Sequence, residues 1–207
     1  MTRMKRQQKE LRGQPSHRED LRGELLAAAV ALVEREGHEG LSMRKLADEV
    51  GVSPGAPYHH FADRRALLAA VALEGYQAML NLTEVNEGGD KDPRDSLFNV
   101  SVSFIRFAEK NPHMFTLMYE SELVRPKLSP ELAAAQEEGF QLLRALVAKV
   151  TSHLSDDERA VRVATIWSAI FGFALQSNRA MIRAYPLEPA PDQLAPEIVR
   201  QALRLLD

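Results

Sequence analysis

The chain has 207 residues, of which 45% are hydrophobic and 27% charged, a balance typical of a globular protein with one or two hydrophobic cores. The absence of cysteine excludes disulfide bonds, thiolate zinc sites and cysteine nucleophiles. The net charge of −3 is unevenly distributed, because residues 1–18 hold six Lys/Arg and one Glu whereas the remaining chain carries −8. We expect a cytosolic protein without a membrane span, since neither a long uninterrupted apolar run nor a secretory signal is present.

The basic arm over residues 1–15 has two interpretations. Clustered Lys and Arg side chains of this kind bind nucleic acid, because cations near phosphates release condensed counterions. The alternative is a solvated tail with no binding role. Whether the arm contacts DNA is therefore left open by the sequence.

Apolar residues recur at helical spacing in every long segment, and none alternates with the period of a β-strand. This pattern predicts an all-α protein of about nine helices. The first begins at a Ser-x-x-Glu capping box, Ser16 and Glu19, and ends at Gly37. Ser42 caps a short second helix over residues 43–50.

Further start and stop signals divide the rest of the chain. Gly51 follows the second helix as a turn residue, and the polar stretch NEGGDKD at residues 86–92 is the clearest break. Start signals are Asp63, Asp92-Pro93, Ser129-Pro130 and a capping box at Ser155 and Glu158. We expect helices over 63–87, 93–110, 112–124, 129–153, 155–184 and 192–206.

Residues 51–61, GVSPGAPYHHF, read as the turn and second helix of a DNA-binding helix-turn-helix, although two prolines stand where that helix should lie. With Ser53 as the N-cap, Pro54 takes the first helical position, where its missing N–H has no cost. Pro57 fits only if the regular helix begins near it, after a loose turn. The prolines thus predict a short, stiff element.

Small residues at the tip of this element, Gly55 and Ala56, suit close approach to a DNA groove. Tyr58 and His59 then supply hydrogen-bond donors just behind the tip. The alternative is a plain helical hairpin in which Tyr58 and Phe61 are both core residues. Adjacent histidines on a helix cannot face one metal ion, so no metal site is expected at His59 and its neighbour.

The run LSMRKLADEVGVSPGAPYHHFADRRALLAAV at residues 41–71, preceded by a helix ending in EREGHEG, resembles the N-terminal domain of tetracycline-repressor (TetR) family regulators. The resemblance implies a DNA-binding domain over 16–62 and a helical effector-binding and dimerisation domain over 63–207, joined through the helix 63–87. Pro54 and Pro57 depart from the family pattern, in which many members carry a polar residue and a leucine there. By position, it implies DNA contacts from Ser42, Arg44, Ser53, Gly55, Ala56, Tyr58, His59 and Arg64.

The C-terminal half carries a weaker resemblance. NPHMFTLMYESE at 111–122 and WSAIFGFALQ at 167–176 are similar to a C-terminal domain type marked by a Trp and a His-Gly pair. Phe171 stands at the histidine position, and only Trp167 and Gly172 match. Large apolar residues concentrate here, as an effector pocket requires, although ordinary core packing is the alternative. The candidate pocket residues are Phe104, Phe107, Met114, Phe115, Met118, Tyr119, Trp167, Ile170 and Phe171.

A stripe of small residues predicts a subunit interface. Ala164, Ser168 and Gly172 recur every four residues and would let another helix approach closely, and the last helix adds Leu194, Ile198 and Leu203. The alternative is packing within one chain. A homodimer suits the implied function, because two recognition elements one DNA turn apart read a pseudo-palindromic operator.

These observations together predict a sequence-specific DNA-binding regulator, most often a repressor in this family, that a small and largely apolar effector releases from its operator. No cofactor is predicted. One alternative is an all-helical enzyme with Glu120, Glu122 or His113 as acid–base groups, although no catalytic motif supports it. A second is a DNA-binding protein without an effector, which a fully packed core would favour.

Overall fold

A computed structural model describes residues 17–87, 92–124, 129–184 and 191–207. Within these ranges the protein consists of eight α-helices and five short 3-10 turns, with no β-strand. The α-helices are α2 (His17–Glu36), α3 (Met43–Val50), α4 (Arg64–Glu87), α5 (Pro93–Lys110), α6 (Pro112–Glu120), α7 (Pro130–Val150), α8 (Asp156–Asn178) and α9 (Pro191–Leu203). The 3-10 turns are η1 (His38–Gly40), η2 (Ala56–His59), η3 (Glu122–Val124), η5 (Met181–Ala184) and η6 (Arg204–Leu206).

The predicted helix-start signals act as caps. The Ser42 hydroxyl accepts a hydrogen bond from the Lys45 backbone N–H at 3.1 Å, and an Asp63 carboxylate oxygen accepts one from Ala66 at 2.8 Å. The side chains of Asp92, Ser129 and Ser155 likewise cap their helices. The first predicted cap, Ser16, lies outside the described residues.

Four helices end earlier than predicted. The ends are Glu120 for α6, Val150 for α7, Asn178 for α8 and Leu203 for α9, whereas the expected segments ran to 124, 153, 184 and 206. Two of these ends have a visible local cause. The backbone becomes extended at Ser121 after α6, and Ala180 adopts a left-handed conformation with φ of 56° after α8.

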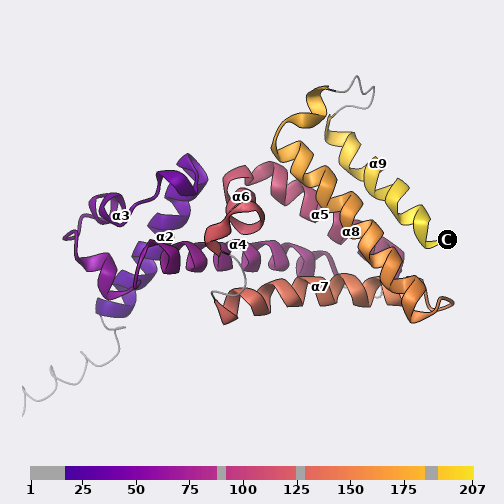
Figure 1. Ribbon diagram of the computed structural model, residues 1–207, viewed down its shortest axis with the longest axis horizontal. Helices are drawn as coiled ribbons and strands as arrows, with labels where there is room; N and C mark the ends of the chain where they lie inside the picture. Colours follow the sequence, from indigo (N-terminus) through magenta and orange to yellow (C-terminus); the bar gives the residue numbers. More distant parts are fainter. Residues whose placement is uncertain (1–16, 88–91, 125–128, 185–190) are drawn as a thin grey trace, which may run out of the picture.

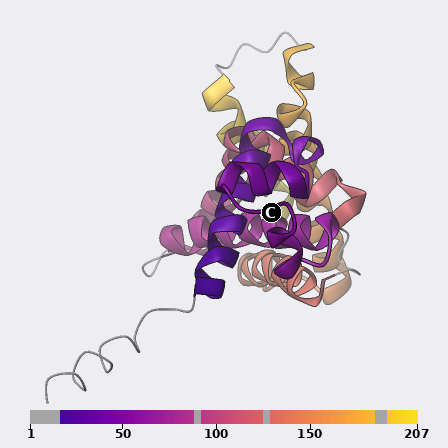
Figure 2. The same ribbon diagram turned by 90° about the vertical axis from the view of Figure 1, so that its left-hand side faces the viewer.

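The helices separate into two ends joined by α4. Figure 1 shows α2, α3 and η2 at one end and α5, α8 and α9 toward the other, with α4 running between them and α7 lying along α4. Figure 2 looks along the molecule from the α2–α3 end. The helix-turn-helix unit is therefore held at one end of the molecule by α4 and α6, which both pack against α2.

One helix, α8, is long and apolar enough to cross a membrane by length and composition alone. It packs against α5, α7 and α9, as a core helix does, but only 28% of its most apolar window is buried inside the chain. Its remaining surface includes Val161, which is 65% exposed. An apolar helix face thus remains uncovered in a single chain.

Candidate DNA-binding surface and ligand cavity

The element after the helix-turn-helix turn is one turn of 3-10 helix, Ala56–His59. It begins beside Pro57 after a turn over residues 53–56, which agrees with the second of the two expected arrangements and not with an α-helix capped by Ser53. No side chain caps it, and Gly55 in αR conformation precedes it. The turn over 53–56 closes through the Ala56 N–H, which donates to the Ser53 carbonyl at 2.9 Å. Pro57 is buried and its carbonyl accepts bonds from two later N–H groups, because a short 3-10 turn tolerates the proline that a longer α-helix would not.

The side chains around η2 divide into an exposed tip and a buried base. Tyr58 is 55% exposed, and Ser53, Gly55 and His59 are also exposed, whereas Ala56 is half-buried. Phe61 is 4% exposed and packs in the core. The exposed groups suit contact with a DNA groove, and the hairpin alternative fails for Tyr58 because its ring is not core.

Arg64, expected to grip a phosphate, makes hydrogen bonds within the chain. Its Nε donates to the Leu41 carbonyl at 2.7 Å and its Nη2 donates to the His38 carbonyl at 2.6 Å. The half-buried guanidinium therefore ties the start of α4 to both ends of the segment between α2 and α3. A role for Arg64 in positioning the helix-turn-helix unit is thus visible, and its contact with DNA stays a prediction.

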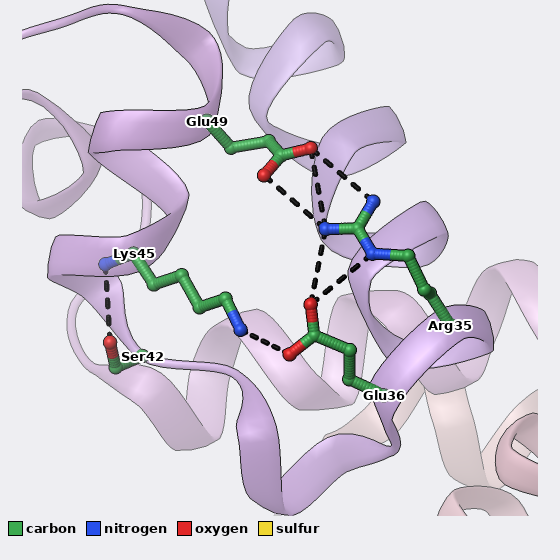
Figure 3. A network of polar contacts seen from close by, with 5 residues as sticks. All are labelled: Arg35, Glu36, Ser42, Lys45 and Glu49. Atoms are coloured by element: carbon green, nitrogen blue, oxygen red, sulfur yellow. Dashed lines mark hydrogen bonds and ion pairs between the residues drawn. The ribbon is translucent and has the colours of Figure 1, made fainter.

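Other basic side chains of the unit are paired with carboxylates (Figure 3). Arg35 contacts Glu49 at 3.3 Å and Glu36 at 3.2 Å, and Lys45 forms an ion pair with Glu36. The hydrogen bond from Lys45 lowers the pKa of the Glu36 carboxyl. Such exposed pairs stabilise a fold only slightly, but they link α2 to α3.

The first helix of the motif, α3, contributes the remaining predicted contacts. Ser42 is exposed, and because its oxygen accepts the capping bond, its hydroxyl hydrogen remains able to donate to a phosphate. Arg44 is exposed and forms no ion pair or hydrogen bond with the part of the chain that the structure describes. The Arg44 side chain is therefore open to solvent, and its contact with DNA stays a prediction.

The helical part beyond α4 encloses a cavity of about 400 Å³. Its lining comes from α4, α5, α6, η3, α7 and α8, and it is mainly apolar and aromatic. A volume of this size falls in the range of small-molecule sites. Five of the predicted pocket residues line it, namely Phe104, Met118, Tyr119, Trp167 and Ile170.

The other four predicted pocket residues do not line this cavity. Phe107 and Met114 line a second one, of about 500 Å³, between α2 and the helices α4, α5 and α6. Phe115 is fully buried, and Phe171 stacks on Trp167 with ring centroids 5.5 Å apart. Both rings therefore pack behind residues that line the cavity. Neighbouring residues of a helix point in different directions, so only some rings of an aromatic cluster face the cavity.

Of the polar residues that line the cavity, the sequence analysis named Tyr119, Glu120 and Glu122 and missed Tyr76 and Gln136. The Tyr76 hydroxyl on α4 donates to the Met118 carbonyl at 3.2 Å and accepts from the Gln136 side chain on α7 at 2.9 Å. Burial raises the pKa of Tyr76 to about 12, and it raises the pKa of Tyr119 well above its usual value. Both phenols therefore stay neutral near pH 7 and offer hydrogen bonds without charge.

Helix α6 lies between this cavity and the helix-turn-helix unit. Met118 faces the cavity, and the sulfur atoms of Met114 and Met118 lie 2.8 and 2.7 Å from where a Cβ would stand on Gly75 of α4. At its other end α6 places His113 against Gly37, whose own Cβ position would lie 3.3 Å from the imidazole. Helix α6 therefore packs directly against both α4 and the residue that follows α2.

The predicted interface residues fall into two groups. Ala164 and Ser168 are exposed on α8, and a Cβ on Gly172 would meet nothing within 4 Å. Leu194 and Leu203 of α9 are buried within the chain, 8% and 3% exposed, because α9 packs on α5 and α8. In a single chain both side chains pack against their own subunit, and their part in a subunit interface stays a prediction. Ile198 is half-buried.

Comparison with known proteins assigns both halves to one family. The sequence model described as "Bacterial regulatory proteins, tetR family" matches residues 25–71, and that described as "Tetracyclin repressor-like, C-terminal domain" matches residues 97–202. The second match alone covers about half of the chain. The first match ends within α4, which joins the helix-turn-helix unit to the cavity, and the second begins within α5.

Individual relatives agree with this assignment. The tetracycline repressor protein class D of Escherichia coli is 25% identical over 190 residues, which cover 90% of this chain and 79% of the relative. A protein of unknown function from Rhodococcus sp. RHA1 has a similar structure, with a TM-score of 0.74, 26% identity and coverage of 93% and 96%. The TetR family regulator PfmR of Thermus thermophilus shares the fold, with a TM-score of 0.62, 21% identity and coverage of 87% and 97%.

Proposed function

Because the chain belongs to the tetracycline-repressor (TetR) family of bacterial regulatory proteins and is a DNA-binding transcriptional regulator, we propose that it is a homodimeric repressor released from its operator when a small molecule fills the cavity. The observation that carries the proposal is the presence, in one chain, of an exposed η2 tip and a cavity of about 400 Å³ joined by α4 and α6. We place its action in the cytoplasm, where the DNA lies.

In this proposal, base contacts come from the η2 tip and positioning contacts from α3. Tyr58 and His59 present donors beside the half-buried Ala56 methyl, and Ser42 and Arg44 face the phosphates. Base edges specify sequence, whereas phosphate contacts fix the register of the protein on the duplex. Because η2 is only four residues long, few side chains read bases directly.

Release follows from the position of α6. A ligand in the cavity displaces Met118, and the close packing of α6 on Gly75 passes the movement to α4. The Arg64 bonds to the His38 and Leu41 carbonyls carry α4 and the helix-turn-helix unit together. The ligand shifts the population of states only if it binds the DNA-incompetent state more tightly.

The uncovered face of α8 supplies the dimer contact in this proposal. Ala164, Ser168 and Gly172 form a smooth stripe next to Val161, and a second copy of the same helix would cover it. A twofold interface of this kind is self-complementary. It also pairs two η2 tips, as a pseudo-palindromic operator requires.

Specific observations favour this function over the two alternatives. An open cavity argues against a DNA-binding protein without an effector, for which a filled core was expected. The acid–base groups of the enzyme alternative are not gathered in one place. Glu120 and Glu122 line the cavity, whereas His113 packs against Gly37 beside the helix-turn-helix unit.

The test is selection of genomic DNA fragments by the purified protein at about 150 mM salt, where sequence-independent phosphate binding is largely screened. We expect enrichment of a pseudo-palindrome whose half-sites lie one helical turn apart. Salt-sensitive binding without sequence preference would contradict the proposal and would assign DNA affinity to the basic arm alone.

A further inference from the structure

One hydroxyl group joins three helices in the wall of the cavity. The Tyr76 hydroxyl, on α4, donates its hydrogen to the Met118 carbonyl of α6 at 3.2 Å. Its oxygen accepts a hydrogen bond from the Gln136 side chain of α7 at 2.9 Å. All three residues line the cavity. The orientation of the Gln136 amide is therefore set by groups on two other helices.

These two hydrogen bonds determine which end of the Gln136 amide is left for a ligand. A backbone carbonyl only accepts, so the single hydroxyl hydrogen of Tyr76 is committed to Met118. The group that Gln136 turns to the Tyr76 oxygen must then be a donor, which is the amide nitrogen. The amide oxygen forms no hydrogen bond with the described part of the chain and is not enclosed by it. The cavity wall thus presents a hydrogen-bond acceptor at Gln136.

The Tyr119 hydroxyl is a second polar group of the wall, and its present bond is weak. Tyr119 lines the same cavity, and its ring meets that of Tyr76 edge-on with the centroids 5.5 Å apart. Its hydroxyl donates to the Met79 sulfur at 3.7 Å, and a thioether is a weak acceptor. An oxygen atom of a ligand would be a better acceptor for this hydrogen. Gln136 and Tyr119 therefore offer one acceptor and one donor, both beside Tyr76.

We infer that the cavity selects apolar molecules that carry a hydroxyl group over ether isomers that cannot donate a hydrogen bond. A hydroxyl donates to the Gln136 oxygen and accepts from Tyr119, whereas an ether accepts only and leaves the Gln136 oxygen unpaired inside the cavity. The apolar remainder packs against the rings of Phe104 and Trp167, which also line the cavity. This ligand class rests on the proposed effector role of the cavity, and it narrows the largely apolar effector expected from the sequence.

The chain contains one tryptophan, Trp167, and because it lines the cavity its fluorescence reports occupancy directly. The experiment titrates the full chain with octan-1-ol and with methyl heptyl ether, which have the same formula and a similar length. We expect the alcohol to bind about threefold to tenfold more tightly, the effect of one additional hydrogen bond. Equal affinities, tighter binding of the ether, or binding of neither isomer would overturn the inference.

A Gln136 variant tests the acceptor. Gln136→Met fills a similar space and removes the amide oxygen, so the two isomers should bind with nearly equal affinity. The matched control is Gln141→Met, at an exposed position of α7 outside the lining, where the preference for the alcohol should stay. A Gln136→Met protein that still prefers the alcohol would contradict the role of Gln136.

A Tyr76 variant tests whether this residue positions the amide. In Tyr76→Phe the Gln136 amide is free to turn and to offer its N–H to a ligand oxygen, so the ether should gain affinity relative to the alcohol. A packing role alone would change the affinities for both isomers alike, so the ratio of the two affinities separates the roles. An unchanged ratio would contradict the fixed orientation of the amide on which the inference rests.

A separate measurement distinguishes the ligand class from the effector role. Octan-1-ol or the ether is added to the protein bound to the DNA selected above, with Trp167 fluorescence confirming that the cavity is occupied. Alcohol-selective binding with the DNA complex intact leaves the ligand class standing and contradicts the proposed release. Release by both isomers at the same concentration supports the effector role and overturns the ligand class.

Discussion

The two ends of the molecule are both built from helices, but they differ in how closely their interiors are packed. The helix-turn-helix unit buries Leu25, Leu46 and Phe61 and presents Tyr58 on a short, proline-stiffened turn, so its binding groups lie on a rigid, exposed tip. The helical part beyond α4 leaves about 400 Å³ of its aromatic interior open. The contrast indicates that DNA contact needs preformed geometry, whereas a response to a ligand needs unfilled space and a helix that can move.

The largest expected effect concerns the uncovered face of α8. Ala164→Arg should place a charge and a long side chain in the proposed interface, converting dimer to monomer and weakening binding to a pseudo-palindrome by about a hundredfold or more. Sedimentation and DNA titration measure both results. The same substitution at Ala145, exposed on α7, is the matched control. A dimeric Ala164→Arg protein would place the interface elsewhere.

An Arg64 variant tests whether hydrogen bonds within the chain stabilise the helix-turn-helix unit. Arg64→Ala removes two hydrogen bonds from a charged donor to backbone carbonyls, and we expect a loss of about 2–4 kcal/mol in the free energy of unfolding. Tyr58→Phe is the comparison, because this exposed hydroxyl should affect DNA affinity, by about twofold to tenfold, without affecting stability. Denaturant unfolding separates the two. An Arg64→Ala protein of unchanged stability would make Arg64 a DNA contact only.

Gly75 tests the contact through which the two ends communicate. Gly75→Ala places a methyl group within 2.9 Å of Met114 and Met118 atoms, and we expect α6 to shift at a cost of about 1–3 kcal/mol. Gly23→Ala in α2, where a Cβ meets nothing within 4 Å, should instead stabilise the protein by about 0.4–1 kcal/mol. Thermal unfolding measures whether each variant is more or less stable than the parent protein. Equal effects would mean that α6 does not pack tightly on α4.

The smallest effect is a pH dependence at the junction of the two ends. Burial, helped by the nearby Arg64 and His113, lowers the pKa of His38 below its ordinary value of 6.5. The unfolded chain therefore binds this proton more readily, so stability should decrease as pH falls from about 7 through the lowered pKa. His38→Gln should make the melting temperature vary less with pH over this range. The carboxylates with lowered pKa values, such as Glu36, change the stability only when the pH falls below about 4.5.

Local signals predicted most of the helix-turn-helix unit. Ser42, Gly51 and Asp63 cap or end their helices as expected, because a cap depends on residues three or four positions away. The same local reasoning overestimated η2, where Pro57 restricts the element to a single 3-10 turn. It could not show that Arg64 bonds to carbonyls 23 and 26 residues earlier.

The cavity depends on contacts that no short segment contains. Gln136 meets Tyr76 across 60 residues, and neither polar residue was expected there, because a single amide or phenol in a helix has no positional signature. Leu194 and Leu203 show what the spacing of apolar residues leaves undecided. Their spacing predicts an apolar face correctly, but spacing does not tell whether that face meets its own chain or another.

The most direct test of the account measures the separation of the two η2 tips in the dimer. The chain has no cysteine, so Ala62→Cys, at an exposed position beside the tip, allows one spin label per subunit. Dipolar spectroscopy on the DNA-bound protein should give one distance near a helical turn of DNA, about 34–36 Å, broadened by the label arms. No dipolar coupling, or a separation that cannot span two successive major grooves, would contradict a dimeric reader of pseudo-palindromic DNA.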